Sequence, residues 1–270
     1  MTTVDERRSG RLNINQVVGG TFAAVSRNLA NYLILAFALV GAPQVVLGWL
    51  RREILRATPT LAGGGSDGAN VHVALLALAT IALALASIFF WALLEAAVMY
   101  GVIEDRSGRK RALSELASFG LGAAPALVAI SLMFGVVFGV GLLLLVVPGL
   151  IILTRWMVAA PARIAEGAGI SRAFSRSAAL THGNRGAVLA IVVLFSLPIW
   201  LITSVLLGSA VALSPATFDP VAASLSIPYI LTSALLNVVV GVIGSAGVAS
   251  VYCELRRLKG EDPRLAAVFE

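Results

Sequence analysis

Six long apolar segments dominate this chain and constrain its fold more than any other feature. Their approximate bounds are 29–50, 71–103, 121–147, 149–166, 187–211 and 228–253. A helix of about 20 apolar residues crosses the hydrocarbon core of a bilayer. Hydrophobic residues make up 59% of the sequence and charged residues 13%, whereas soluble domains are about 45–50% apolar and about 25% charged. The sequence therefore predicts an all-α, polytopic membrane protein with six transmembrane helices.

The cationic residues between these segments alternate from one side of the membrane to the other. Sixteen Lys and Arg residues precede the first segment, follow the last, lie between the second and third, or lie from the inner end of the fourth, at Arg163, to the start of the fifth. The other loops hold only Arg51, Arg52 and Arg56, while Arg155 falls inside the fourth segment. Because cytoplasmic loops are enriched in Lys and Arg, we expect both termini in the cytoplasm. The net charge of +6 then indicates contact with anionic lipid headgroups and not with nucleic acid.

Short amphipathic stretches precede alternate apolar segments on the cytoplasmic side. Such stretches are typical of helices that lie in the membrane interface. We therefore expect three helical hairpins, each preceded by an interfacial helix, in one membrane domain over 29–253, flanked by an amphipathic N-terminus (1–28) and a cytoplasmic tail (254–270). The apolar positions of the three stretches are Ile14, Val17, Val18, Phe22 and Val25, then Leu113, Leu116 and Leu121, then Ile170, Phe174 and Ala178.

The second segment and the junction of the third and fourth need particular geometry. As one helix, 33 residues from Val71 to Ile103 would measure about 50 Å, so this helix must tilt strongly or emerge from the bilayer. The third and fourth segments meet at Val147-Pro148-Gly149, which predicts a tight turn. That turn is expected at the outer face.

Three polar side chains inside the apolar segments are candidates for a ligand or transport site. Arg155 is one, because an ionisable group within a membrane is costly and often functional. The alternatives are that Arg155 forms a structural ion pair, or that its long side chain extends outward so that the guanidinium reaches the phosphate headgroups. Glu95 pairs with Arg155 if the second helix tilts strongly, or with the interfacial Arg163 or Arg185. Asn237 is expected to hydrogen-bond to another helix.

Glycines spaced along two segments indicate close helix contacts. Small residues four apart allow helix backbones to approach within a membrane. Gly135 and Gly139 have this spacing in the third segment, and Gly241, Gly244 and Gly247 line the sixth. The pattern fits packing inside the chain or self-association.

The chemistry-bearing residues do not form a recognisable catalytic set. The chain has one cysteine, Cys253, and two histidines, His72 and His182, which the topology places on opposite faces of the membrane. The carboxylates cluster only beside arginine or lysine, at Glu104-Asp105 and Glu261-Asp262, as solvated interfacial charges. We therefore expect no catalytic residue, no metal site and no cofactor.

The stretch from Pro148 to Leu189, which includes the fourth segment, carries a set of motif residues. They are Pro148-Gly149, Arg155-Trp156, Ala160-Pro161, Glu166-Gly167, Ala173, Arg176-Ser177, Leu180-Thr181 and Gly183-Asn184, followed near the end of the chain by Tyr252-Cys253-Glu254-Leu255-Arg256 and Lys259-Gly260-Glu261-Asp262. With these residues the chain resembles a bacterial family of six-span membrane proteins. This family includes the membrane domain found with some glycerophosphoryl diester phosphodiesterases and the YciC-like inner-membrane proteins.

The resemblance implies an integral protein of the bacterial inner membrane with no settled molecular role. In that family the phosphodiesterase activity belongs to a separate soluble domain with metal-binding carboxylates and catalytic histidines. The residues here do not supply that set, so the resemblance transfers no activity. It does give weight to Arg155 and Glu166, which both fall on the motif.

Two functional hypotheses follow from the sequence. The first is a non-catalytic accessory or scaffold protein that engages lipids, a partner membrane protein or a second copy of itself. The alternative is a transporter or permease for a small or lipid-derived substrate, which rests on Arg155, Glu95 and Asn237, with Pro43 and Pro198 as interruptions within helices. A transporter should place these polar groups around one cavity, whereas a scaffold should hold them apart.

Overall fold

A computed structural model describes residues 12–61, 66–212 and 223–261, and these residues contain only helices, turns and short connections. Expectations for the N-terminal arginines before residue 12, for parts of the two outer loops and for the tail after residue 261 lie outside the described residues. The elements are α1 (Ile14–Arg27), α2 (Leu29–Ala36), the π-helical η2 (Phe37–Gly41), α3 (Ala42–Leu61), α4 (Ser66–Arg106), α5 (Leu113–Leu144), α6 (Val146–Trp156), α7 (Ala159–Glu166), α8 (Ile170–Thr181), α9 (Arg185–Ala212) and α11 (Ile227–Leu258).

The prediction of an all-helical protein with six apolar segments is confirmed. Among the described residues, six helical stretches are long and apolar enough to cross a membrane. They are Leu29–Arg56, Ala74–Arg106, Leu113–Leu144, Val146–Glu166, Arg185–Ser209 and Ile227–Leu258.

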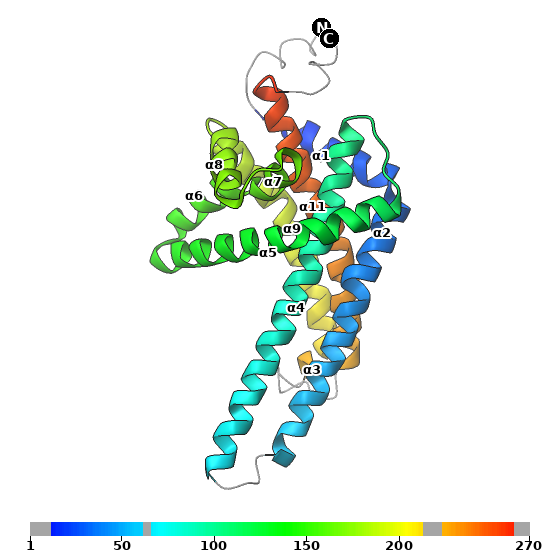
Figure 1. The fold of residues 1–270 in the computed structure, drawn as a ribbon, viewed down its shortest axis with the longest axis vertical. Helices are drawn as coiled ribbons and strands as arrows, with labels where there is room; N and C mark the ends of the chain where they lie inside the picture. Colours follow the sequence, from blue (N-terminus) through cyan, green and yellow to red (C-terminus); the bar gives the residue numbers. More distant parts are fainter. Residues whose placement is uncertain (1–11, 62–65, 213–222, 262–270) are drawn as a thin grey trace.

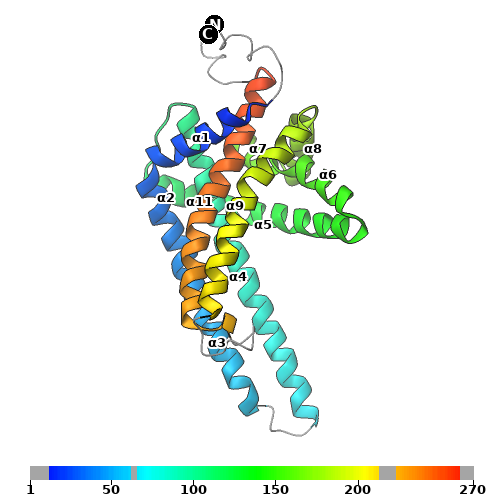
Figure 2. The same cartoon turned by 180° about the vertical axis from the view of Figure 1, so that it is seen from behind.

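The six stretches do not all run in the same direction. Helices α3, α4, α9 and α11 follow the long axis of the molecule, whereas the hairpin of α5 and α6 runs across that axis and projects from one side (Figures 1 and 2). The short helices α1, α7 and α8 lie near the end of the molecule where α4 and α11 finish. At the opposite end, α3 and α4 extend past the ends of α9 and α11.

The main core forms where α1, α2 and α11 pack against α4. Its fully buried side chains include Tyr32, Leu94 and Val98, together with Val242 of α11. Close approach is possible because small residues lie at the crossings. A Cβ on Gly101 would lie 2.7 Å from the Tyr32 hydroxyl oxygen. This core therefore holds the end of α4 that carries the charged residues.

The first apolar stretch is interrupted near Pro43, as its sequence suggests. The π-helical segment Phe37–Gly41 lies just before this proline. A proline ring has no N–H and crowds the carbonyl four residues earlier, and a π-helical turn widens the backbone at that point. Pro198, by contrast, lies inside the continuous helix α9.

Separate short helices occur at two of the three stretches for which interfacial helices were predicted, and their position in a membrane interface stays a prediction. Helices α1 and α8 are separate short helices, and α1 buries Val17, Thr21 and Ala24. The stretch from Leu113 to Leu121 is not separate, because α5 continues through it without a break to Leu144. No proline or left-handed residue ends the helix there, and Pro125 is accommodated within it.

The predicted turn at Pro148 was misplaced by three residues. The chain reverses at Leu145, whose backbone is extended (φ −170°, ψ 151°), and Pro148 lies in the first turn of α6. A proline fits there because the first N–H groups of a helix have no intrahelical acceptor. Gly149 packs against α5, where a Cβ would lie 2.7 Å from Leu142 Cδ2.

Gly120→Ala tests the crossing of α5 over α4. A Cβ at position 120 would lie 2.9 Å from the backbone oxygen of Leu93 and 3.3 Å from Ala97 Cβ. Because the backbone must shift to make room, we expect a loss of about 1–3 kcal/mol in stability. The matched control is Gly122→Ala on the same helix, where a Cβ meets nothing within 4 Å. Thermal unfolding of the purified protein in detergent should show a lower midpoint for the first variant only; equal midpoints would contradict this crossing.

Candidate functional site

The motif that runs from Pro148 to Leu189 surrounds a break in the helix. Helix α6 ends at Trp156 and α7 begins at Ala159. Such a break leaves carbonyl groups at the end of α6 without their usual N–H donors. The Ser177 hydroxyl donates to the Arg155 carbonyl oxygen at 2.8 Å, and the Thr181 hydroxyl lies 3.4 Å from the same oxygen. Two motif residues of α8 thus satisfy the backbone of a third.

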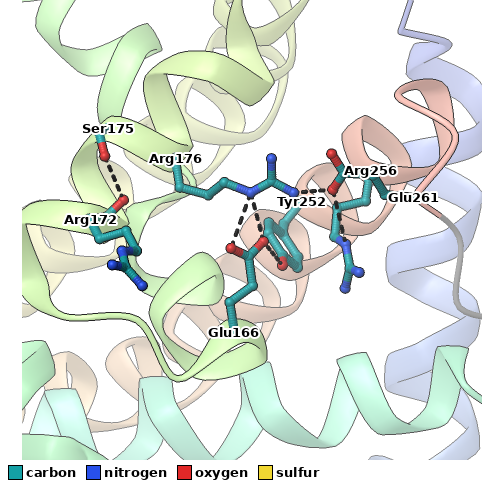
Figure 3. A network of polar contacts seen from close by, with 7 residues as sticks. All are labelled: Glu166, Arg172, Ser175, Arg176, Tyr252, Arg256 and Glu261. Atoms are coloured by element: carbon teal, nitrogen blue, oxygen red, sulfur yellow. Dashed lines mark hydrogen bonds and ion pairs between the residues drawn. The ribbon is translucent and has the colours of Figure 1, made fainter.

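A polar network joins α7, α8 and the end of α11 (Figure 3). Glu166, the last residue of α7, accepts a hydrogen bond from Arg176 Nε at 2.8 Å and another from the Tyr252 hydroxyl at 3.0 Å. Arg176 also donates to Glu261 through Nη2. The Arg256 guanidinium lies 3.8 Å from Glu261 and 5.7 Å from the centre of the Tyr252 ring.

This network neutralises its charges internally. The pKa of the Arg176 guanidinium lies above its ordinary value because it donates to Glu261 and to Glu166. Paired carboxylates and guanidinium groups with several hydrogen bonds are geometrically fixed. The arrangement therefore holds three helix ends together.

Two glycines of the motif provide turns that other residues adopt at a cost. Gly167 follows α7 with φ +61°, and Gly183 follows α8 with φ +87°. Left-handed backbone of this kind is accessible to glycine without strain. The turn at Gly183 presents Asn184, whose side-chain oxygen accepts a hydrogen bond from the Leu12 N–H at 2.9 Å. The N-terminal segment is thereby attached to the motif.

The structure separates Arg155 from the other two predicted intramembrane polar residues. Arg155 is exposed on α6, and its side chain lines neither of the two pockets that contain the other residues. Among the described side chains, no ion pair joins Glu95 to Arg155, to Arg163 or to Arg185.

Glu95 and Asn237 line two pockets that adjoin each other. The larger pocket, about 440 Å³, lies between α9 and α11 and includes Asn237. The smaller, about 260 Å³, lies where α4 meets the α5–α6 hairpin and includes Glu95. Met157, Val192 and Val248 line both pockets. A single elongated molecule could therefore contact both polar residues.

The walls of these pockets are mainly apolar. Beside Asn237, the larger pocket has the hydroxyl groups of Ser196 and Thr203 among aliphatic and aromatic side chains. Beside Glu95, the smaller has Ser131. Ligand sites usually combine an apolar wall with a few polar groups that fix orientation, in volumes of about 300–1,000 Å³. Such walls suit an alkyl chain better than a hydrated ion.

The predicted glycine stripes have unequal roles within the chain. Gly241 lies close to α4, where a Cβ would be 2.7 Å from Leu94 Cδ2. At Gly247 the nearest contact would be 3.8 Å, an ordinary distance. At Gly135, Gly139 and Gly244 a Cβ would meet no atom within 4 Å. Only part of the stripe on α11 is therefore used for packing inside the chain.

The carboxylates at the end of α4 are paired, which corrects their interpretation as solvated charges. Glu104 is 7% exposed and lies 2.9 Å from Arg109 and 2.8 Å from Arg111. Asp105 lies 2.5 Å from Arg27, and this contact raises the pKa of the Arg27 guanidinium. The sequence signal was the adjacency of acidic and basic residues. It could not show that one partner would come from α1.

No group of three or more His, Cys, Asp or Glu side chains that could hold a metal ion occurs in 12–61, 66–212 and 223–261.

No protein-family model, curated protein or solved structure matches the chain.

Ser177→Ala tests whether α8 stabilises the helix break. Removing this hydroxyl leaves the Arg155 carbonyl with the longer contact to Thr181, so we expect a loss of about 1 kcal/mol, or about 2–4 °C in the thermal midpoint for a chain of this size. The control is Ser175→Ala, also on α8, whose exposed hydroxyl bonds only to Arg172 within its own helix. A midpoint lowered equally by both substitutions would count against a specific role for Ser177.

Proposed function

We propose that this protein is a non-catalytic integral membrane protein that binds a lipid or lipid-like chain between its helices and acts as an accessory or scaffold protein. The observation that carries this proposal is the pair of adjoining, mainly apolar pockets lined by Asn237 and Glu95. Their walls match the chemistry of an acyl chain, and the few polar groups would interact with its polar end.

The distribution of charge supports a lipid-facing role at one side of the membrane. The sixteen cations of the predicted cytoplasmic loops would attract anionic headgroups at about 1 kcal/mol for each residue near the surface. We place the protein in the bacterial inner membrane with both termini in the cytoplasm. Nucleic acid is not among the proposed partners.

The resemblance to the six-span bacterial family forms part of this proposal. The motif residues that carry the resemblance converge on one structural unit. Ser177 donates a hydrogen bond to the backbone at the helix break, Glu166 and Arg176 belong to the polar network, and Gly183 forms the turn after α8. This convergence supports a structural role for the motif. A second copy or another membrane protein could bind at the glycine positions on α5, Gly135 and Gly139, which are not covered within the chain.

Gly244→Leu tests whether lipid occupies the larger pocket. Gly244 lines this pocket, and a Cβ there meets no atom within 4 Å, so a leucine side chain would enter the space without a clash. It would displace about three methylene groups of a bound chain, each worth about 0.8 kcal/mol, and affinity should fall at least about tenfold. Native mass spectrometry of protein released from nanodiscs would measure the fraction with bound lipid.

The matched control is Gly135→Leu, which makes the same change in open space outside both pockets. This variant should keep its bound lipid. If Gly244→Leu retains as much lipid as the control, the lipid binds elsewhere and the proposed site is wrong.

A transporter for a lipid-derived substrate is the second candidate, favoured because Glu95 and Asn237 line adjoining pockets. The two hypotheses differ in whether lipid crosses between leaflets. In vesicles with a fluorescent phospholipid, dithionite bleaching measures that crossing. We expect no crossing above the rate of empty vesicles. Crossing that Glu95→Gln abolishes, but Glu53→Gln on the outer part of α3 leaves intact, would favour the transporter.

A further inference from the structure

Helix α6 is too short to cross a membrane by itself. It contains 11 residues, which span about 16 Å at 1.5 Å per residue, whereas the hydrocarbon core is about 30 Å thick. The chain then breaks before α7, whose last residue, Glu166, is already in the polar network with the end of α11. This arm of the hairpin therefore contains no single straight helix long enough to reach the opposite face of the membrane.

The turn of the α5–α6 hairpin has no polar side chain that would suit an aqueous surface. The 22 residues of 132–153 are all apolar. The residues at the turn are also among the most exposed large hydrophobic side chains of the described residues, and Leu143 is 88% exposed. Leaving such side chains in water is costly, at about 25 cal/mol per Å² of apolar surface. Hydrocarbon is the environment that these residues fit.

Both ends of the hairpin carry cations and lie on the same side. Arg109, Lys110 and Arg111 precede α5. On the other arm, the carbonyl of Arg155 bonds to α8 beside Arg176, which belongs to the network at the end of α11. The positive-inside rule therefore fits a hairpin that crosses twice and equally well one that enters and returns.

The hairpin also crosses α4 close to that same end. Gly120 of α5 lies against Leu93 and Ala97 of α4. Ala97 is seven residues before the buried, ion-paired Glu104, a distance of about 10 Å along the helix. Figures 1 and 2 show α5 and α6 continuing from this crossing across the long axis. The hairpin stays near the depth at which it crosses α4.

From these observations we propose that α5 and α6 form a re-entrant hairpin embedded in the cytoplasmic leaflet, with its turn at Leu145 surrounded by acyl chains of that leaflet. Irregular backbone at membrane depth needs protein contacts to satisfy its polar groups. Here the Leu145 N–H donates to the Gly141 carbonyl oxygen at 3.1 Å, and the break after α6 is satisfied by Ser177. The membrane is then crossed by four helical stretches, two of which contain α4 and α11.

This arrangement also accounts for Arg155. In a hairpin that crossed twice, this residue would lie near the outer side of the membrane. In the re-entrant hairpin it lies beside α8 on the cytoplasmic side. There its exposed side chain is long enough to place the guanidinium among the lipid headgroups. The inference does not depend on lipid binding in the pockets, because it concerns the outer surface of the hairpin.

Fluorescence quenching by lipids of one leaflet tests the proposal. The native thiol is removed by Cys253→Ala, and a bimane fluorophore is attached to Leu145→Cys or, as a control, to Val205→Cys. Val205 is 70% exposed and lies near the end of α9 remote from Arg185. The protein is placed in uniformly oriented vesicles, and a nitroxide phospholipid is introduced into the outer leaflet only or into both leaflets.

With nitroxide lipid in one leaflet, we expect only one of the two labels to be quenched, because they lie in opposite leaflets. With nitroxide lipid in both leaflets, both labels should be quenched severalfold. Quenching of both labels from the same leaflet would show that the hairpin crosses the membrane. A label at position 145 that no lipid quenches would show that protein covers the turn. Either result would overturn the proposal, and thermal unfolding of each labelled variant confirms that it is folded.

Discussion

At the break between α6 and α7, side chains of α8 supply polar partners for the backbone. Within a membrane, backbone groups that leave a helix must find partners in the protein, since hydrocarbon offers none. The hydroxyl of Ser177 supplies this partner for the Arg155 carbonyl, and it does so only if α8 lies against the end of α6. That position brings Arg176 within reach of Glu166 and Glu261. The local hydrogen bond and the polar network therefore require the same placement of α8.

The same placement connects the hairpin to the rest of the molecule. Glu166 accepts from Tyr252, a buried residue near the end of α11, so the network joins the hairpin to the helix that α4 also contacts. On the other arm, α5 approaches α4 where Gly120 faces Leu93 and Ala97. A polar contact at one arm and a steric fit at the other thus position the hairpin.

Much of the helical architecture could be predicted because it depends on local sequence. The apolar runs gave the six stretches, and helical spacing identified α1 and α8. The turn at Leu145 was missed because Pro148 resembles a turn residue, although a proline is equally suited to the first turn of a helix. The stretch beginning at Leu113 was misread for a related reason, because its amphipathic spacing continues into an apolar helix without a stop signal.

The candidate site could be predicted less well because its contacts join distant parts of the chain. The motif residues Glu166 and Arg176 were recognised together, but nothing in their spacing showed that Glu261 and Tyr252 would complete the network. Glycine spacing was a weak guide, since the same pattern covers Gly241, which faces Leu94, and Gly135, where a Cβ would meet no atom within 4 Å. Which glycine is used depends on where helices cross.

The distribution of charge indicates which loops face the cytoplasm, but it does not give the number of membrane crossings. The cations before α5 and after α6 are on one side whether the hairpin crosses or returns, so counting them cannot separate the two topologies. Length and polarity favour the re-entrant topology that we propose, because the 11 residues of α6 are too few to span the core in one straight helix and the residues at the turn are all apolar. An apolar run of sufficient total length is therefore compatible with a crossing but does not require one. The chain's own break at Met157 decides how much of that length lies in one straight helix.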